Sequence, residues 1–248
     1  MDWSDEGIVL SLRPHGETSA ILEALTREHG RHLGLVHGGA GSKRRAVLQP
    51  GNQVKLNWRG RLSEHLGTFT VEPVRARAHA MFERRAALIG LNAFTSVAAA
   101  VLPEREPHRS AFKGAEVLLD AIAAHAFADW APLYVRWEAG LLDELGFGLD
   151  LTRCAATGAT ENLAYISPRS GRAVSEEGAG PYRDRLLPLP AFMLGRQAGA
   201  TGAADLLAGL TLTQHFLESA VLIPHGKALP AARRQLTGLA AREAGESS

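Results

Sequence analysis

The 248-residue sequence is poor in cysteine, in aromatic side chains and in long apolar runs, and each shortage narrows what the chain can be. Its one cysteine, Cys154, cannot form an internal disulfide. The chain has no run of about 18 apolar residues, so we expect no membrane span. Residues 1–6 are acidic where a secretory signal would be basic. We therefore expect a cytoplasmic protein.

The motifs of common enzyme classes are missing as well. The sequence contains no Gly-x-Ser-x-Gly, no His-Glu-x-x-His and no dinucleotide-binding fingerprint. Segment 38–45 is rich in glycine, but it is not a P-loop because Ser42 precedes the lysine and two arginines follow it. His29, His32 and His37 have no second group of ligands nearby, and we interpret them as turn and surface residues. We predict a protein that is not an enzyme and holds no cofactor and no metal.

The net charge of +1 hides an uneven distribution of charge. Between residues 27 and 61 there are eight cations and a single acid, Glu28, a net of +7. Residues 81–248 carry a net of −2. An ordinary soluble surface mixes charges of both signs, so this positive stretch predicts a polyanion-binding surface. The candidate DNA-binding residues are Arg27, Arg31, Lys43, Arg44, Arg45, Lys55, Arg59 and Arg61.

Residues 6–72 read as short strands separated by glycine turns. We expect strands at 7–13, 20–26, 31–36, 53–59 and 65–71. Five strands at this spacing are typical of a small closed barrel, for which a five-stranded OB-fold is the leading candidate and an SH3-like barrel the second.

Two segments of this barrel carry the predicted interface. In 53–59 the residues alternate, so that Trp58 belongs to the core while Lys55 and Arg59 share the outward face. Segment 38–45 is interpreted as a flexible glycine loop that carries three adjacent cations to phosphates. With 6 % aromatic residues, extensive stacking on bases is not evident, and backbone binding is favoured over base readout.

The pattern changes to a helical one after Pro73. We expect helices at 79–101, 109–126, 130–145, 202–223 and 230–242. Residues 150–185 lose this periodicity and predict an irregular insert that contains at most a short hairpin. The fold class is therefore α+β, with an OB-fold DNA-binding domain at 1–78 and an all-α domain at 79–248.

Several segments, in this order and spacing, resemble the RecO family of bacterial recombination and repair mediators. In the barrel they are EGIVL at 6–10, RPHGET at 13–18, LTREHGR at 25–31, KRR at 43–45 and LQP at 48–50. In the helical part they are WE at 137–138, LDELGFGLD at 142–150, Cys154, ISPRSGR at 166–172 and LIPHGKALP at 222–230. The resemblance covers nearly the whole chain.

The resemblance implies an N-terminal OB-fold, a helical bundle and, in some members, a four-cysteine zinc module. This chain keeps one of the four cysteines, and Thr157 stands where the next thiol would be. We therefore expect a zinc-less relic of that module, held by packing around Tyr165 and Ile166.

RecO-like proteins are expected to bind single- and double-stranded DNA and to anneal complementary strands. With RecR they load the recombinase RecA, an indirect partner, onto DNA coated by single-strand-binding protein. This implies a nucleoid-associated protein. An RNA-binding OB-fold protein of ribosome assembly or translation is the alternative, and an enzyme that uses the helical domain is a third possibility.

The resemblance also implies that the acidic C-terminal tail of single-strand-binding protein is captured. A tail that is both charged and apolar requires a pocket between helices with cations at its rim. Arg109 and Lys113 lie four residues apart and share a helix face, and Arg136 precedes Trp137, whose ring would wall the pocket. The candidate partner-binding residues are thus Arg109, Lys113 and Arg136.

Overall fold

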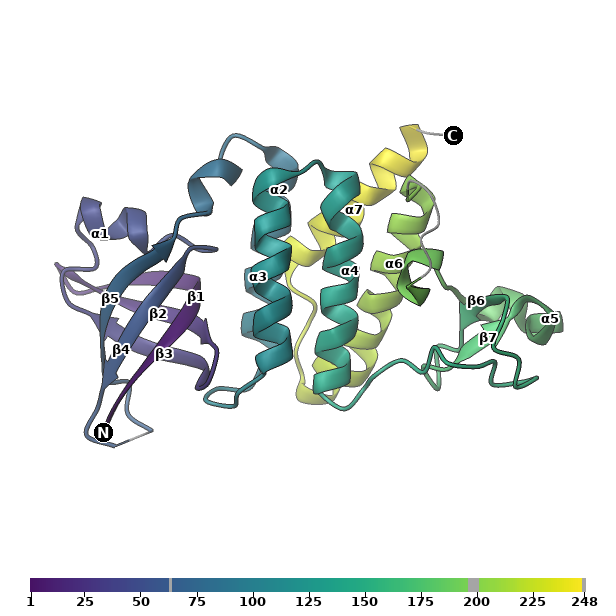
Figure 1. The fold of residues 1–248 in the computed structure, drawn as a ribbon, viewed down its shortest axis with the longest axis horizontal. Coiled ribbons are helices and arrows are strands. Elements are labelled where there is room, and N and C mark those ends of the chain that lie inside the picture. Colours follow the sequence, from purple (N-terminus) through teal and green to yellow (C-terminus); the bar gives the residue numbers. More distant parts are fainter. Residues whose placement is uncertain (63, 196–200, 247–248) are drawn as a thin grey trace. The chain divides into compact units, whose positions relative to one another are not determined.

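A computed structural model describes residues 1–62, 64–195 and 201–246, without the side chains of Lys43 and Glu246. The chain divides into two compact units, residues 1–124 and 125–248, each of which is described by itself. The first unit contains the barrel and the two long helices that follow it in the chain (Figure 1). The predicted domain boundary between residues 78 and 79 stays a prediction.

Five strands close into a barrel, as predicted. They are β1 (Asp2–His15), β2 (Ser19–Thr26), β3 (Gly30–Val36), β4 (Gln53–Arg59) and β5 (Thr68–Arg75). Their order around the barrel is β1-β2-β3-β5-β4, and β4 closes it by pairing with β1. All pairs are antiparallel except β3 and β5, which meet in parallel at Leu35 and Thr68. This topology, with a helix between β3 and β4, confirms the OB-fold and the α+β class.

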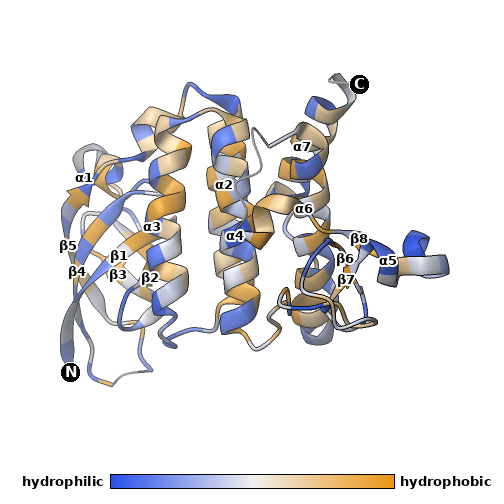
Figure 2. Cartoon of the chain, turned by 45° about the vertical axis from the view of Figure 1, so that its right-hand side comes forward, coloured by the Kyte–Doolittle hydropathy of each residue, from blue (hydrophilic) through white to orange (hydrophobic). Residues whose placement is uncertain are grey.

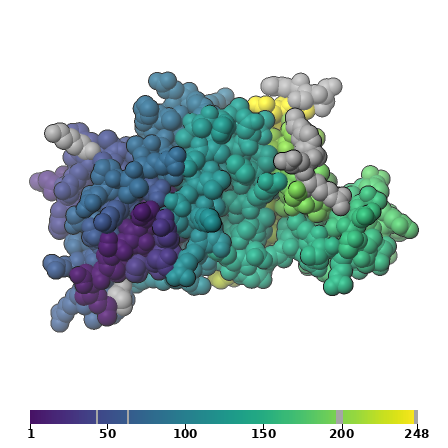
Figure 3. Space-filling model, in the orientation of Figure 1, coloured from purple at the N-terminus to yellow at the C-terminus, as the bar shows by residue number. Residues whose placement is uncertain are grey.

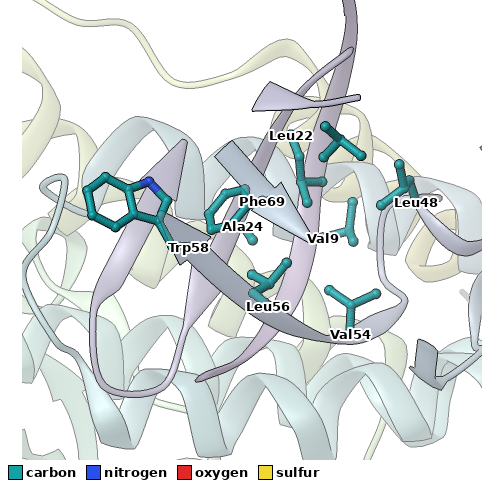
Figure 4. Packing of buried hydrophobic residues seen from close by; sticks show 9 residues of the cluster. Val9, Leu22, Ala24, Leu48, Val54, Leu56, Trp58 and Phe69 are labelled. Atoms are coloured by element: carbon teal, nitrogen blue, oxygen red, sulfur yellow. The ribbon is translucent and has the colours of Figure 1, made fainter. Parts of the chain in front are cut away.

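The barrel core follows from the alternation along the strands. Val54, Leu56 and Trp58 of β4 are at most 2 % exposed and point inward, while Lys55 and Arg59 are exposed. Figure 4 shows these residues packed with partners from the other strands, with Trp58 and Leu48 at opposite ends of the cluster. The Trp58 indole nitrogen donates to the carbonyl of Leu66 at 3.0 Å, so burial leaves no unpaired donor on the ring.

The segment after β3 differs from the prediction of a flexible glycine loop. Residues 37–40 form a turn, and a short helix, α1 (Ser42–Val47), carries the cations. Arg45 donates its backbone N–H to Gly41 and Leu48 donates to Arg44, while Leu48 itself is buried in the barrel core. The prediction was wrong because Lys-Arg-Arg-Ala is a run of good helix formers, which the preceding glycines concealed.

The rest of the first unit is helical. It comprises the 3₁₀ turn η1 (Ala78–Met81), α2 (Arg85–Val101) and α3 (Arg109–Ala124). Helix α3 carries both hydrophobic and hydrophilic residues (Figure 2), and its buried residues recur at the spacing of one helix face, as in an amphipathic helix. The Arg84 guanidinium donates to the carbonyls of Ile122 and Ala123 at 3.1 and 2.9 Å and so caps the C-terminal end of α3.

The second unit is built from three long helices and a small insert. The helices are α4 (Phe127–Glu144), α6 (Ala203–Phe216) and α7 (Ala231–Glu246). A π-helical turn, η4 (Leu217–Leu222), and a 3₁₀ turn, η5 (Ile223–His225), continue α6. The helix expected at 130–145 begins earlier, at Phe127, and Pro132 lies inside it.

The insert is more regular than its composition suggested. A three-stranded sheet, in the order β7-β6-β8, joins β6 (Leu163–Ile166), β7 (Ala173–Ser175) and β8 (Leu187–Pro188). The short helix α5 (Glu176–Ala179) and the 3₁₀ turns η2 (Gly180–Arg185) and η3 (Ala191–Leu194) complete the insert. Tyr165 and Ile166 are buried in β6, where packing was expected to hold this region.

An ion pair without solvent exposure joins the three long helices of the second unit. Arg233 of α7 donates from Nε to Oε1 of Glu138 on α4 at 2.6 Å and from Nη2 to Oε2 at 2.8 Å. Thr213 of α6 donates to Glu138 Oε2 at 2.6 Å, and Arg233 also donates to the carbonyl of Leu210. Burial and the neighbouring Glu138 charge raise the pKa of Tyr134, whose ring lies 5.5 Å from the Arg233 guanidinium. The pair thus fixes the register of α4, α6 and α7.

One stretch of the described chain, Ala203–His225, is long and apolar enough to cross a membrane by length and composition. Half of it is buried within the protein, and it includes Leu206, Leu210 and Leu217 of the packed core. A core helix of a globular domain can be equally long and apolar, and α6 is such a helix because its apolar residues are packed in the core.

Candidate nucleic-acid interface

The eight predicted DNA-binding cations do not form one patch on the barrel. Because the strands alternate in direction, the connections fall at two ends. The β1–β2 turn and the segment with α1 lie at one end, whereas the N-terminus, the β2–β3 turn and the β4–β5 loop lie at the other (Figure 1). Arg44 and Arg45 therefore lie at the first end, Arg59 and Arg61 at the second, and Lys55 between them.

At the first end, a buried asparagine fixes α1. The Asn52 amide donates to the carbonyls of Ala46 and Val47 at 3.0 and 3.1 Å, which satisfies the end of α1. Its oxygen accepts from the backbone N–H groups of Arg77 and Ala78 at 2.8 and 3.0 Å. Asn52 is 4 % exposed, and it holds α1 against the segment that leaves β5.

The cations on α1 are exposed and have no acidic partner among the described residues. Arg44 donates to the carbonyl of His37, a contact that leaves its charge uncompensated. Arg45 makes no side-chain hydrogen bond or ion pair with a described residue. The sequence contains no acid between Glu28 and Glu64. The side chain of Lys43 lies outside what the structure describes.

The outward face of β4 is electrostatically different. Lys55 pairs in register with Glu6 of β1 and with Glu72 of β5, and Arg59 pairs with Asp2. Residues directly opposite each other share a face of the sheet, so two acids flank Lys55 and one acid lies opposite Arg59. The start of β1 lies at the surface, in dark purple in Figure 3. Lys55 and Arg59 are four residues apart, roughly 13 Å along the strand.

Two further cations are already engaged with carboxylates. Arg31 has a side chain 14 % exposed, with Nη1 2.6 Å from Glu23 and Nε donating to the carbonyl of Leu102 at 2.8 Å. Arg27 lies 3.1 Å from Glu6, and its guanidinium is 5.1 Å from the centre of the Phe112 ring. Arg61, in contrast, is exposed and makes no ion pair with a described residue.

Aromatic rings gather at the second end of the barrel. Trp3 stacks on His29 with ring centroids 4.1 Å apart, and His32 packs edge-on against Trp3 and Trp58. The prediction that the histidines are turn and surface residues was wrong for His32, which is 3 % exposed. Burial lowers the pKa of His32, although its hydrogen bond with the Leu33 carbonyl opposes the shift. No group of three potential metal ligands occurs among the residues that the structure describes.

The cations predicted to bind a partner are divided between the two units. Arg109 and Lys113 lie on α3, and Arg109 pairs with Glu28, which raises the pKa of Arg109. Arg136 lies on α4 in the other unit, where Nε and Nη2 donate to the Phe192 carbonyl at 3.1 and 2.5 Å. Trp137 is 5 % exposed, so its ring belongs to the packed interior of that unit.

Sequence reasoning missed three features of this interface. The acids Asp2, Glu6 and Glu72 are distant from β4 in the sequence, and only strand pairing brings them beside its cations. The fixing role of Asn52 leaves no pattern in the sequence. Helix α1 was detectable from the run of good helix formers at 43–46.

Comparisons with known proteins match both the N-terminal and the C-terminal part of the chain to one family. A family model described as Recombination protein O N terminal matches residues 1–77, and one described as Recombination protein O C terminal matches residues 83–228. The chain belongs to the RecO family. The DNA repair protein RecO of Cereibacter sphaeroides is 51 % identical over 244 residues, 98 % of this chain and 100 % of the relative. That of Paracoccus denitrificans is 54 % identical over 237 residues, 95 % of each chain.

The RecO zinc module implied by the resemblance does not fit the residues that this chain supplies. Cys154 and Thr157 face Ser175 and Gly178, two pairs with the spacing of zinc knuckles, but only the first residue is a thiol. Ser175 Oγ donates to Cys154 Sγ at 3.3 Å and the Thr157 N–H donates at 3.4 Å. A Cβ at Gly178 would lie 2.7 Å from the Cys154 sulfur. The sulfur therefore fills the space that a metal-binding side chain at residue 178 would need.

These contacts define the chemistry of the cysteine in this RecO-family chain. Burial raises the pKa of the Cys154 thiol, but the hydrogen bonds from Ser175 and Thr157 outweigh burial and lower it to about 6. The Ser175 hydroxyl and the Thr157 amide are thus the groups that donate to this sulfur.

Proposed function

We propose that the chain is a non-catalytic DNA-binding mediator of recombination and repair. In this proposal it binds single- and double-stranded DNA and anneals complementary strands. With RecR it helps to load RecA onto single-stranded DNA coated by single-strand-binding protein. Membership of the RecO family and the names of the relatives, DNA repair proteins, support this assignment. A cytoplasmic location and association with the nucleoid follow from it.

The observation that carries the proposal is the uncompensated charge on α1. Arg44 and Arg45 are exposed, their helix is fixed by Asn52, and no described acid neutralises them. Two fixed cations that make no ion pair with a described acid attract phosphates at little cost, since no internal ion pair must break. Phosphate contacts carry no sequence information, which suits a protein that holds any strand.

The predicted cations are expected to contribute unequally to DNA binding. Lys43, Arg44, Arg45 and Arg61 are the principal contacts. Lys55 and Arg59 are weaker because of the acids opposite them. For Arg27 and Arg31, internal ion pairs must be exchanged for phosphate contacts, so they contribute least.

The test is charge reversal on α1. Lys43→Glu, Arg44→Glu and Arg45→Glu together should weaken binding to every DNA sequence about equally. If roughly four phosphates are neutralised on a single strand, the wild-type log–log salt slope should be near −3, and the variant's slope should be much shallower.

A matched control carries the same change in net charge in the other unit. It reverses Arg153, Arg169 and Arg185, which are exposed. Normal binding and annealing by the α1 variant at low salt would refute the proposal. Equal affinity for RNA and DNA of one sequence, together with no binding of the tail peptide of single-strand-binding protein, would favour the RNA-binding alternative.

For the helical residues, the proposal is capture of that acidic tail by Arg109, Lys113 and Arg136. Lys113 is exposed on α3 and makes no ion pair with a described residue, whereas Arg109 must exchange its contact with Glu28. Changing all three to Ala should abolish tail-peptide binding in calorimetry and leave annealing of naked DNA intact. Unchanged peptide binding would place the pocket elsewhere.

A further inference from the structure

A small cavity opens beside α1 at the first end of the barrel, with a volume of about 200 Å³. Leu12 and Pro14 of β1 and Ala20 of β2 form one part of its wall. Leu48 and Pro50, which follow α1, form another. The cavity is smaller than the roughly 300–1,000 Å³ of sites that hold drug-sized ligands, so it suits a compact, flat group.

The polar part of the lining lies on the side of α1. Arg45 and Gln49 are the polar residues of the lining, and Gly39 and Ala40 complete the wall. Gln49 is half-buried, and its amide has no hydrogen-bond partner among the described residues. An unengaged amide offers both a donor and an acceptor, which is what the edge of a nucleobase requires.

We propose that this cavity binds one unstacked base of single-stranded DNA. Apolar walls with two proline rings cover the faces of the base, the Gln49 amide meets its edge, and Arg45 at the rim pairs with an adjacent phosphate. The uncompensated charge of Arg44 and Arg45 selects a ligand that carries anionic groups next to an uncharged ring. The cavity borders the β1–β2 turn, a region that OB-folds use to bind oligonucleotides.

A single base site explains how a protein can hold a strand and still permit annealing. One buried base anchors the strand on the barrel, while α1 holds the backbone on either side through phosphates. The remaining bases face solvent and stay free to pair with a complementary strand. This inference rests on the proposed function, because it requires single-stranded DNA to lie along α1.

The test compares a ten-nucleotide oligothymidylate with an oligonucleotide of the same length in which every base is replaced by hydrogen. Both carry the same phosphates, so their difference isolates the bases. The wild-type protein should bind the base-bearing strand about tenfold more tightly. Equal affinity for the two strands would overturn the inference while leaving phosphate binding intact.

Two variants that add the same side-chain bulk at different places test whether the preference for the base-bearing strand depends on the cavity. Ala40→Leu adds bulk inside the cavity, and the backbone of Ala40 does not have a positive φ. It should abolish the preference for the base-bearing strand and leave the affinity for the abasic strand unchanged. Ala46→Leu adds the same bulk on the exposed surface of α1 and should retain the preference. A preference that survives in Ala40→Leu would refute the site.

A measurement on the wild-type protein avoids dependence on the folding of a variant. A 2-aminopurine within a single strand is quenched by stacking on its neighbours. None of the described residues that line the cavity is aromatic, so a base that enters it should become brighter. No change in fluorescence at saturation would overturn the inference. Failure of both oligonucleotides to bind at low salt would overturn the proposed function itself.

Discussion

Arg233 in the second unit and the arginines of α1 in the first illustrate opposite uses of the same side chain. Arg233 is 0 % exposed and donates to Glu138, to the Thr213 and Thr237 hydroxyls and to the Leu210 carbonyl. Arg45 is exposed and has no described acidic partner. A cation with every donor satisfied organises the fold, whereas a cation left uncompensated remains available to an external anion.

The largest expected effect is the loss of the buried pair. Arg233→Ala leaves Glu138 charged and buried without its partner, which should lower the free energy of unfolding by about 3–5 kcal/mol. Urea unfolding followed by circular dichroism measures this. Replacing both partners by apolar residues, Glu138→Leu with Arg233→Met, should recover most of the loss. A cost below about 1 kcal/mol for Arg233→Ala would refute the structural role.

The next effect compares compensated and uncompensated cations within the barrel unit. Arg44→Gln with Arg45→Gln should make the salt slope for single-stranded DNA shallower by about 1.4, since each phosphate contact contributes roughly 0.7. Arg27→Gln with Arg31→Gln removes the same charge but should leave the slope nearly unchanged, because these two residues bind carboxylates of the protein. Titrations at several salt concentrations decide it, and equal slopes for the two variants would contradict the comparison.

A smaller effect concerns a buried group that stays neutral. Burial lowers the pKa of His32 from its ordinary value of 6.5, so the unfolded chain takes up its proton at a higher pH than the folded chain. The folded state with neutral His32 is therefore favoured at high pH. The corresponding part of the free energy of unfolding is complete above pH 6.5 and is lost as the pH falls from 6.5 through the pKa of the folded protein. Urea unfolding between pH 7.5 and pH 5.5 should therefore depend less on pH in His32→Phe (the range brackets the ordinary histidine pKa). The same change at exposed His15 should leave the dependence as in the wild type.

The smallest expected effect is at Cys154, where hydrogen bonds satisfy a sulfur without a metal. Cys154→Ala should cost about 1 kcal/mol, because Ser175 and the Thr157 N–H each lose an acceptor. Elemental analysis of the wild type should find no stoichiometric zinc, and chelators should leave its Tm unchanged. About one zinc per chain would refute this prediction.

A reconstructed site sharpens the same prediction. Thr157→Cys with Ser175→Cys would bring three thiols together without a Cβ at Gly178, where it would lie 2.7 Å from Cys154 Sγ, and this variant should take up zinc and become sensitive to chelators. Failure of the three-thiol variant to bind zinc would contradict the convergence of Cys154, Thr157 and Ser175.

Much of the barrel could be predicted from short-range patterns. Period-two alternation identified β4 and the inward position of Trp58, and glycine turns marked off five successive strands of the barrel. These features are local, because the pleat of a strand sets which side chains share a face. The same reasoning placed the long helices, with errors of a few residues at their ends.

The charge at the interface could not be read from the sequence. A window of 35 residues with one acid suggested a single positive surface, yet pairing with β1 and β5 places Glu6 and Glu72 opposite Lys55. The buried partnership of Glu138 with Arg233 joins residues 95 positions apart, and no local pattern announces it. Electrostatic compensation depends on distance in space, not in sequence.

The sequence by itself therefore determined the five barrel strands and the long helices, the inward and outward faces of β4, and membership of the RecO family through motifs that survive in order. The tertiary structure decided which cations remain free, how Asn52 fixes α1, and where walls from β1, β2 and the end of α1 enclose a cavity. The physical reason is that hydrophobic periodicity is a property of neighbouring residues, whereas charge compensation and cavities arise only where distant segments meet.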